Sequence, residues 1–326
     1  MTTILVSSAG CRVELIRCFR SAAEVLGLDL RVIAVDLNPE MSSACQEANK
    51  SFKISRCTTP EFVTELTGIC CAEKVQLIVP TIDTELQTLA DHQPQLEAIG
   101  ARVLVSAPSL IRMARDKAET AKFLEQHGIP TPRTAPLGEL LAQPDSWLWP
   151  VILKPIHGSS SVGIRVARTF DEAKMAAADR KDYVAQEYLR GREYTVNIFF
   201  DRSGVLRAAV PHLRYETRAG EVSKGITERE PTLVNLAWKL GAILEGASGP
   251  LCFQAIITEE GRVGVFEINA RFGGGYPLAH QAGATFAKWL LEEAAGLPSS
   301  ANDRWEEGLT MLRYSASFFR KSIPGK

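Results

Sequence analysis

The chain has 326 residues, 45% of them hydrophobic, so it can bury more than one core and is expected to be a multidomain globular protein. Its 37 basic and 38 acidic residues give a net charge of −1 with no long run of Lys or Arg, which argues against a nucleic-acid partner. The apolar runs are far shorter than the roughly 18–20 residues that cross a bilayer, so no membrane partner is expected. The opening MTTILVSSAG indicates a strand and not a signal peptide, which favours a cytoplasmic location.

The first hundred residues alternate β-rich runs with helical patterns. They predict strands over 3–9, 30–37, 76–82 and 102–108, and helices that end near residue 26 and cover 61–71 and 86–96. This alternation predicts an α/β domain in which an open parallel sheet carries helices on both faces.

The turn after the first strand, SSAGCR, has one glycine where a dinucleotide-binding turn has three. An NAD-dependent enzyme is therefore disfavoured. Asp36, at the end of the second predicted strand, could bind a ribose, but without the glycine turn a loop or helix-capping role is the better interpretation.

Seven cysteines, an odd number, do not follow zinc-site spacing. We expect reduced, mostly buried thiols. The adjacent Cys70 and Cys71 could have a redox role, although helix packing is the favoured interpretation.

A boundary follows at Pro108, which begins a predicted helix over 108–128, with IPTP as a linker. Short strands joined by tight turns come next, so this half is predicted to be α+β with antiparallel pairing. A helix from Pro231 to about Glu245 precedes a hairpin whose strands cover 251–258 and 263–271.

Lys154 ends an apolar strand, and the glycine- and serine-rich loop 157–163 follows it. Backbone amides, hydroxyls and an ammonium group together suit phosphate oxygens. An ordinary hairpin turn with a solvated lysine is an equally weighted alternative.

The strand FEINAR carries Glu267 and Asn269 two residues apart, so both side chains point to one face. Gln254, on the preceding strand, can lie opposite them, and Arg271 extends the same face. Oxygen donors of this kind suit magnesium. A structural cluster is the alternative, which the cost of burying a carboxylate among amides disfavours.

Residues 186–196, QEYLRGREYTV, lie between these regions. Glu193 could accept hydrogen bonds from ribose hydroxyls, and the main chain of 187–189 could bind an adenine edge. In isolation the segment is only a charged β-turn.

In this order, the lysine, the glycine-rich loop, QEYLRGRE and FEINARFGGG resemble the ATP-grasp superfamily. FEINARFGGGYP is most similar to single-module relatives of the carbamoyl-phosphate synthase large subunit. The resemblance implies an N-terminal α/β domain over 1–112, a small lid subdomain over 113–185 and a larger antiparallel-sheet subdomain over 186–326.

The resemblance also implies roles for individual residues, with ATP and Mg²⁺ (or Mn²⁺) as cofactors. Nucleotide contacts are expected from Lys117, Lys154, His157, Gly158, Ser159, Ser160, Ser161, Gly163, Gln186, Glu187, Tyr188, Leu189 and Glu193. Metal ligands are expected at Gln254, Glu267 and Asn269; many members have an acidic residue in place of Gln254, which could weaken that position. Catalytic roles are expected for Arg271, Lys154, Arg214 and Lys224, and substrate contacts for Arg214, Arg218, Arg271, Gly273 and Gly274.

Arg214, Arg218 and Lys224 are expected on a loop over 213–225, where a merely solvated loop has nearly equal weight. His157 and His280 could each act as a base for an incoming amine, although a capping or surface role is favoured for both.

The implied reaction is ATP-dependent activation of a carboxylate as an acyl phosphate, which an amine captures. Phosphorylation of bicarbonate or carbamate is one alternative, and a catalytically silent nucleotide-binding regulator is another. The expected partners are small carboxylate and amine substrates, with a homodimer as the default assembly.

Overall fold

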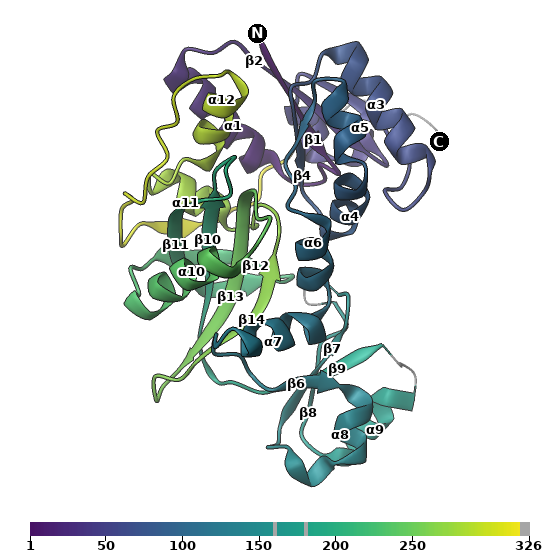
Figure 1. The fold of residues 1–326 in the computed structure, drawn as a ribbon, viewed down its shortest axis with the longest axis vertical. Coiled ribbons are helices and arrows are strands. Elements are labelled where there is room, and N and C mark those ends of the chain that lie inside the picture. The colour runs from purple at the N-terminus through teal and green to yellow at the C-terminus, as the bar shows by residue number, and fades with distance from the viewer. Residues whose placement is uncertain (159–161, 179–181, 320–326) are drawn as a thin grey trace.

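The computed structural model describes residues 1–158, 162–178 and 182–319, and these residues form three sheets (Figure 1). Residues Ser159, Ser160 and Ser161, which the sequence assigns to the nucleotide site, lie outside the described residues. The small sheet with α8 and α9 lies at the lower end of the molecule, and the N-terminal sheet lies at the opposite end.

The N-terminal sheet lies within residues 1–158 and has parallel strands in the order β3-β2-β1-β4-β5. Its strands are β1 (Thr2–Ser7), β2 (Leu30–Asp36), β3 (Lys50–Lys53), β4 (Leu77–Pro80) and β5 (Arg102–Val103). The helices between them are α1 (Val13–Leu26), the 3-10 turn η1 (Pro39–Met41), α2 (Ser43–Glu47), α3 (Glu61–Glu73), α4 (Asp83–Asp91) and α5 (Gln93–Ala98).

Successive residues of β1 enter two different apolar clusters, as the period of two along a strand requires. Leu5 packs into the cluster that contains α3, α4 and α5, whereas Ile4 and Val6 pack into the cluster that contains α1. Helices thus cover both faces of the sheet, which confirms the predicted open parallel architecture.

Two of the predicted helices are each divided in two. The helix predicted over 86–96 is α4 and α5, which meet at His92 just before Pro94. The helix predicted over 108–128 is α6 (Pro108–Arg115) and α7 (Lys117–Gln126). Asp116 separates them because its extended backbone lets its carboxylate cap the amides of Ala118 and Glu119.

The large antiparallel sheet lies within residues 182–319 in the order β14-β13-β10-β11-β12-β15. Its strands are β10 (Gly191–Phe200), β11 (Leu206–Arg218), β12 (Glu221–Thr227), β13 (Gly249–Thr258), β14 (Val263–Asn269) and β15 (Thr310–Leu312). The helices of this half are α10 (Pro231–Ile243), α11 (Tyr276–Gln281) and α12 (Phe286–Ala294). The predicted hairpin is therefore β13–β14.

The small antiparallel sheet has four described strands in the order β6-β9-β7-β8. They are β6 (Thr134–Pro136), β7 (Val151–Pro155), β8 (Arg165–Ala167) and β9 (Tyr183–Glu187). The helices α8 (Leu137–Ala142) and α9 (Phe170–Ala178) and the 3-10 turn η2 (Pro144–Ser146) accompany them. The subdomain boundaries given by the resemblance, at 112/113 and 185/186, stay a prediction.

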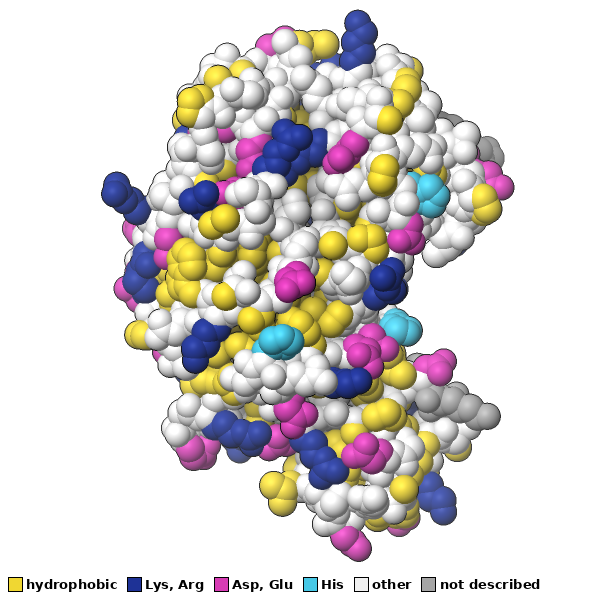
Figure 2. Space-filling view, viewed as in Figure 1, with side chains coloured by type: hydrophobic (Ala, Val, Ile, Leu, Met, Phe, Trp, Pro, Cys, Tyr) yellow, Lys and Arg dark blue, Asp and Glu magenta, His cyan; other side chains and the backbone are white. Residues whose placement is uncertain are grey.

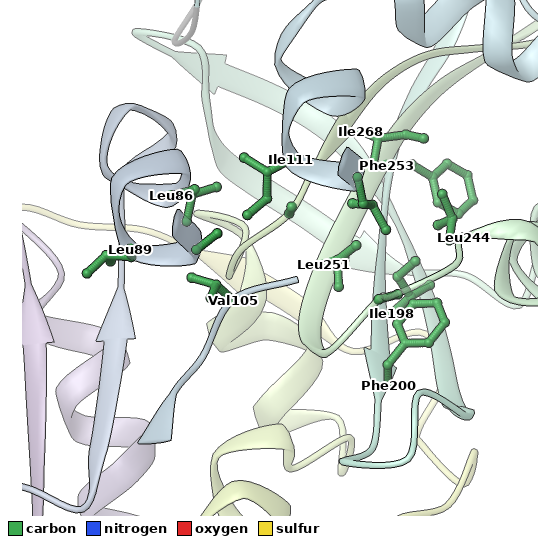
Figure 3. Close-up of a cluster of buried hydrophobic side chains, with 14 of the residues drawn as sticks. Leu86, Leu89, Val105, Ile111, Ile198, Phe200, Leu244, Leu251, Phe253 and Ile268 are labelled. Carbon is green, nitrogen blue, oxygen red and sulfur yellow. The ribbon is translucent and has the colours of Figure 1, made fainter. Parts of the chain in front are cut away.

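One apolar cluster joins the N-terminal sheet to the large sheet (Figure 3). Leu86 and Leu89 of α4 lie on one side of Ile111 of α6, and Leu251 and Phe253 of β13 lie on the other. The small sheet has a separate cluster built around Leu140, Leu153 and Ala173. The N-terminal domain is thus packed as part of the main body of the molecule.

The face of the molecule in Figure 2 carries Lys, Arg, Asp and Glu side chains interspersed with one another. Among the helices of the described residues, none combines the length and the apolar character that a bilayer crossing needs.

Candidate functional site

A cavity of about 230 Å³ lies between the small sheet and the large sheet. β7 and β9 line it from one side, β13 and β14 from the other, and the turn after β1 reaches it through Arg12. Most of the site residues that the sequence predicts line this cavity. They are Lys117, Lys154, Gly158, Gln186, Glu187, Leu189, Glu193, Arg214, Gln254, Glu267, Asn269, Arg271, Gly273 and Gly274. Residues more than 150 positions apart therefore face one space.

Glu267 and Gln254 are directly opposite each other in the β13–β14 register, and Asn269 is opposite Cys252. The amide of Gln254 satisfies both neighbours when its nitrogen donates to Glu267 Oε2 at 3.2 Å and its oxygen accepts from Arg214 Nη1 at 2.7 Å. In this orientation Glu267 and Asn269 present the oxygen donors, and Gln254 orients the carboxylate.

A carboxylate and an amide oxygen on one wall are ligands that suit Mg²⁺, which completes its coordination with water and phosphate oxygens. Within the described residues there is no cluster of three or more His, Cys, Asp or Glu side chains that could hold an ion unaided. The residues present therefore fit a magnesium ion that is shared with a phosphorylated ligand.

Arg271 lies next to this pair, and its side chain is 12% exposed. Its Nη2 donates to Asp83 Oδ2 at 2.6 Å and to Asn269 Oδ1 at 3.4 Å. Its Nε is a buried donor with no hydrogen-bond partner among the described residues. A buried N–H without a partner is costly, so this nitrogen is suited to an oxyanion.

Lys154 is 6% exposed, and its Nζ donates to Gln186 Oε1 at 2.6 Å. Gln186 in turn donates to Thr134 Oγ1 at 2.8 Å, and the ring of Phe266 lies 4.6 Å from the ammonium. Burial lowers the pKa of Lys154 to about 8, although Glu267 opposes the shift. The neighbouring residues thus do not fully neutralise the charged lysine. This is expected of a group that binds phosphate.

Lys117, the first residue of α7, is also buried, and its Nζ donates to the carbonyl of Gly158 at 2.7 Å. Burial lowers its pKa, while Glu267 and Asp83 act in the opposite direction. The contact joins α7 to the start of the glycine-rich loop.

The candidate base-binding end of the cavity is fixed by an ion pair. Glu187 Oε2 accepts from Arg262 Nη2 at 2.7 Å, and the Glu187 amide donates to the Arg133 carbonyl at 2.8 Å. The amide of Glu187 is therefore occupied within the sheet. Tyr188, which is 41% exposed, lies outside the cavity lining.

Glu193 and Arg214 lie on neighbouring strands and form an ion pair in which Nε and Oε1 are 3.3 Å apart. Arg214 also donates from Nη2 to the Gly220 carbonyl at 2.8 Å and is well buried. Both side chains reach the cavity. A ribose contact by Glu193 would therefore either replace its ion pair with Arg214 or form beside it.

Residues 213–225 form a hairpin of β11 and β12 and not the expected loop. The turn is tight because Ala219 and Gly220 both adopt positive φ, at 48° and 77°. Arg218 and Lys224 pair with Glu216 at 3.2 and 2.7 Å, outside the cavity lining. In this conformation Arg214 is the member of the expected trio that reaches the site.

The two histidines differ. His157 Nδ1 lies 3.3 Å from the Arg115 carbonyl. Neither His157 nor Gly163 lines the main cavity. His280 is buried between Tyr276 and Ser21, at 2.9 and 3.1 Å, and burial lowers its pKa to about 4. His280 is thus a buried packing residue, neither the cap nor the surface histidine that the sequence favoured.

Sequence reasoning missed the residues that the N-terminal domain contributes. Asp83 begins α4 just after β4, and Arg12 lies in the turn after β1. Both follow the carboxyl ends of parallel strands, where open α/β sheets bind ligands, and that rule could have found them. Asp36 caps the same turn by accepting from the Gly10 amide at 2.9 Å, the loop role favoured for it.

Residues 4–104 match the family model described as PylC-like, N-terminal domain, and residues 114–275 match that of the ATP-grasp domain. The chain belongs to the ATP-grasp superfamily. These matches do not assign the chain to the carbamoyl-phosphate synthase-like branch of the superfamily.

Two curated relatives illustrate the range of the superfamily. The chain is 35% identical over 126 residues to a D-alanine--D-alanine ligase of Bordetella pertussis, a stretch that is 36% of this chain and 39% of that enzyme. It is 27% identical over 220 residues to a 5-formaminoimidazole-4-carboxamide-1-(beta)-D-ribofuranosyl 5'-monophosphate synthetase of Pyrobaculum neutrophilum, over 57% of this chain and 61% of that enzyme.

Solved ATP-grasp structures share the fold. The biotin carboxylase domain of the Hydrogenobacter thermophilus 2-oxoglutarate carboxylase, in complex with MgADP and bicarbonate, has a TM-score of 0.75 at 17% identity and covers 94% of this chain and 73% of that one. The L-amino acid ligase of Bacillus licheniformis has a TM-score of 0.68 at 18% identity, over 92% of this chain and 75% of that one.

Proposed function

We propose that the protein is an ATP-dependent carboxylate–amine ligase that activates a carboxylate as an acyl phosphate. The observation that carries the proposal is the convergence of an oxygen-donor pair, Glu267 and Asn269, with two buried lysines on one cavity. The named activities of the Bordetella and Bacillus ligases support this class of reaction.

The nucleotide would bind between the two antiparallel sheets. Lys117 and Lys154 would neutralise phosphate oxygens, and the apolar side chains of Ile152 and Leu189 would contact the base. Magnesium, held by Glu267 and Asn269, would supply charge neutralisation to the phosphates. The buried Nε of Arg271 would donate to the transferred phosphoryl group.

A carboxylate nucleophile is already ionised at neutral pH, so the first step needs no general base. Phosphoryl transfer requires mainly positioning and charge neutralisation. The charged residues around the cavity could supply both. The attack of the amine would follow on the acyl phosphate, with inorganic phosphate as the leaving group.

Phosphorylation of bicarbonate or carbamate is the second candidate. The structural likeness to a biotin carboxylase domain in complex with bicarbonate favours it, although at 17% identity that likeness concerns the fold. A homodimer, Mn²⁺ in place of Mg²⁺, and a cytoplasmic location also stay proposals.

The test is ADP release over a panel of carboxylic acids, with hydroxylamine present to trap acyl phosphates as hydroxamates. We expect ADP and hydroxamate in equal amounts, and Glu267→Gln should lower kcat at least about tenfold and raise the Mg²⁺ requirement. The exposed Glu259→Gln, in the turn of the same hairpin, should behave like the wild type.

Three outcomes separate the candidates. ADP release that depends on bicarbonate, without hydroxamate from any other acid, supports the second candidate. Tight MgADP binding without turnover across the panel supports a nucleotide-binding regulator. Full activity of the Glu267→Gln variant contradicts the proposed metal site.

A further inference from the structure

A fully buried carboxylate joins two segments of the N-terminal domain that lead to the site. Glu85, in the first turn of α4, is 0% exposed. Its Oε2 accepts from the hydroxyls of Ser7 and Ser8 at 2.6 and 2.8 Å. Its Oε1 accepts from the backbone amides of Thr81 and Ile82 at 2.7 and 3.2 Å. One oxygen thus holds the end of β1, and the other holds the segment between β4 and α4.

Both segments continue directly to residues that face the site. The turn after β1 runs from Ser8 to Arg12, which lines the cavity. The segment after β4 ends at Asp83, whose carboxylate accepts from Arg271 Nη2 at 2.6 Å. Thr81 joins the two segments a second time, because its Oγ1 donates to the Ser8 carbonyl at 2.7 Å. The position of Asp83 is therefore tied to a buried carboxylate two residues further along the chain.

The surroundings of Glu85 are costly for a residue that only caps a helix. Each of its four partners among the described residues is an uncharged O–H or N–H group. Burial raises its pKa, although the hydrogen bonds oppose the shift. One of those bonds caps α4 at the Ile82 amide, which an uncharged side chain could also do. The cost of the buried charge is better explained by the geometry that it fixes in both segments.

We propose that Glu85 is a positioning residue of the phosphoryl-transfer site, which fixes residues 81–83 so that Asp83 holds Arg271 toward the γ-phosphate. The inference rests on the proposed function, in which the buried Nε of Arg271 donates to that phosphoryl group. Glu85 is fully buried and lies outside the cavity lining formed by the described residues, so it acts through Asp83 and Arg271. A misplacement of about 1 Å at a catalytic group can lower a rate by about a hundredfold.

The experiment measures binding of two nucleotides and does not require turnover. The wild type and Glu85→Ala are titrated calorimetrically with MgADP and with the Mg²⁺ complex of the β,γ-imido analogue of ATP. We expect Glu85→Ala to weaken binding of the analogue about tenfold, because Arg271 no longer points at the γ-phosphate. The affinity for MgADP, which lacks that group, should stay within about twofold. Glu85→Asp, which keeps the charge and shortens its reach, gives the same comparison if the alanine variant does not fold.

Two further variants separate positioning from general destabilisation. Leu89→Ala is the matched control, because Leu89 is a fully buried residue of the same helix in the core shared with the large sheet (Figure 3). It should change both affinities by the same factor. Glu85→Gln should bind both nucleotides within about twofold of the wild type, since its amide oxygen accepts from the two amides and its nitrogen donates to the serine hydroxyls.

A double-mutant cycle tests the route through Asp83. Asp83→Asn should itself weaken binding of the analogue selectively, and adding Glu85→Ala to it should cost no more than about twofold further. Effects that multiply in full would show that Glu85 does not act through Asp83 and would overturn the proposal. Equal weakening of MgADP and the analogue in Glu85→Ala would overturn it too, because that is the result of a purely structural role.

The positioning role and the ligase fail differently. Selective loss of analogue binding in Glu85→Ala, without ADP release or hydroxamate from the wild type, supports the positioning role and contradicts the ligase. Hydroxamate formation by the wild type, with unchanged binding of both nucleotides by Glu85→Ala, supports the ligase and overturns the positioning role.

Discussion

The carboxylate of Asp83 and the guanidinium of Arg271 meet at 2.6 Å although they are 188 residues apart in the chain. Asp83 belongs to the N-terminal sheet domain, and Arg271 is the second residue after the strand that carries Glu267 and Asn269. The side chains are 18% and 12% exposed, so the pair is shielded from solvent. The N-terminal domain therefore sets the orientation of a residue in the proposed phosphoryl-transfer site.

Replacing Asp83 with Asn should lower kcat by about tenfold to a hundredfold with a smaller change in the KM for ATP. The reason is that Arg271 would keep its charge and lose its charge-assisted partner. Steady-state ADP release measures both constants. Asp91→Asn, at the exposed end of the same helix, is the control, and equal activity of the two variants would show that the pair has no functional role.

Nucleotide binding should be coupled to proton uptake by Lys154. Its pKa is about 8 in the free protein because burial disfavours the ammonium form, and phosphate oxygens beside it would favour that form. Near pH 8 binding should therefore take up a fraction of a proton, whereas near pH 6 it should take up none at this group. Calorimetry in two buffers with different ionisation enthalpies measures the uptake, and Lys154→Met should abolish it.

The same shift affects the stability of the nucleotide-free protein. Because the folded pKa of Lys154 is below the ordinary value of 10.5, the unfolded chain binds more protons between pH 8 and 10.5. This group's contribution to the free energy of unfolding therefore rises with pH across that window, and below pH 8 the full penalty of the buried charge applies. Comparing the wild type with Lys154→Met by urea denaturation at pH 7 and pH 9.5 isolates the effect.

Gly275→Ala should destabilise the protein by about 1–3 kcal/mol, the usual cost of overpacking. A Cβ at this position would lie 2.5 Å from Nε2 of His212, a fully buried side chain whose Nδ1 lies 3.2 Å from Asn197 Nδ2. Gly138→Ala is the matched control because nothing lies within 4 Å of its added Cβ in α8. There no loss of stability is expected, because the added methyl group meets no neighbouring atom. Urea midpoints that respond equally would contradict the packing argument.

All seven cysteines are free, and Cys11 and Cys71 are exposed. A thiol reagent should label these two rapidly in the native protein and all seven after denaturation without reductant. Cys70 should react slowly because burial raises its pKa to about 12. A total below seven in the denatured protein would reveal a disulfide and would reopen the redox interpretation of the Cys70–Cys71 pair.

Much of the fold is readable from the sequence because strands that are buried on both faces leave continuous apolar runs. The central residues of β1, β2 and β4, around Ile4, Val32 and Ile78, are apolar, as expected for strands covered on both faces. The break at Asp116 left no such signal, because the flanking segments α6 and α7 both have helical patterns. Only the cap made by the Asp116 side chain reveals the boundary.

Some residues of the candidate site also have a local sequence signal, and others do not. Glu267 and Asn269 share a face because strand side chains alternate, so a local rule brings them together with Gln254 across a short turn. Asp83 contacts Arg271, and Arg12 reaches the cavity, through packing between elements far apart in the chain, which no local period encodes. Residues 213–225 were misplaced because the positive φ of Ala219 allows a tight turn that a non-glycine residue rarely makes.

The apolar cluster of the small sheet, built around Leu140 and Leu153, shares no member with the clusters of the main body. A rotation of that sheet over the cavity therefore leaves each of the three apolar clusters intact. Its heat-capacity change should be small beside that of unfolding, and its energetics should depend in part on polar contacts such as Lys117 with Gly158. Separating the N-terminal sheet from the large sheet would expose a continuous core and amount to unfolding.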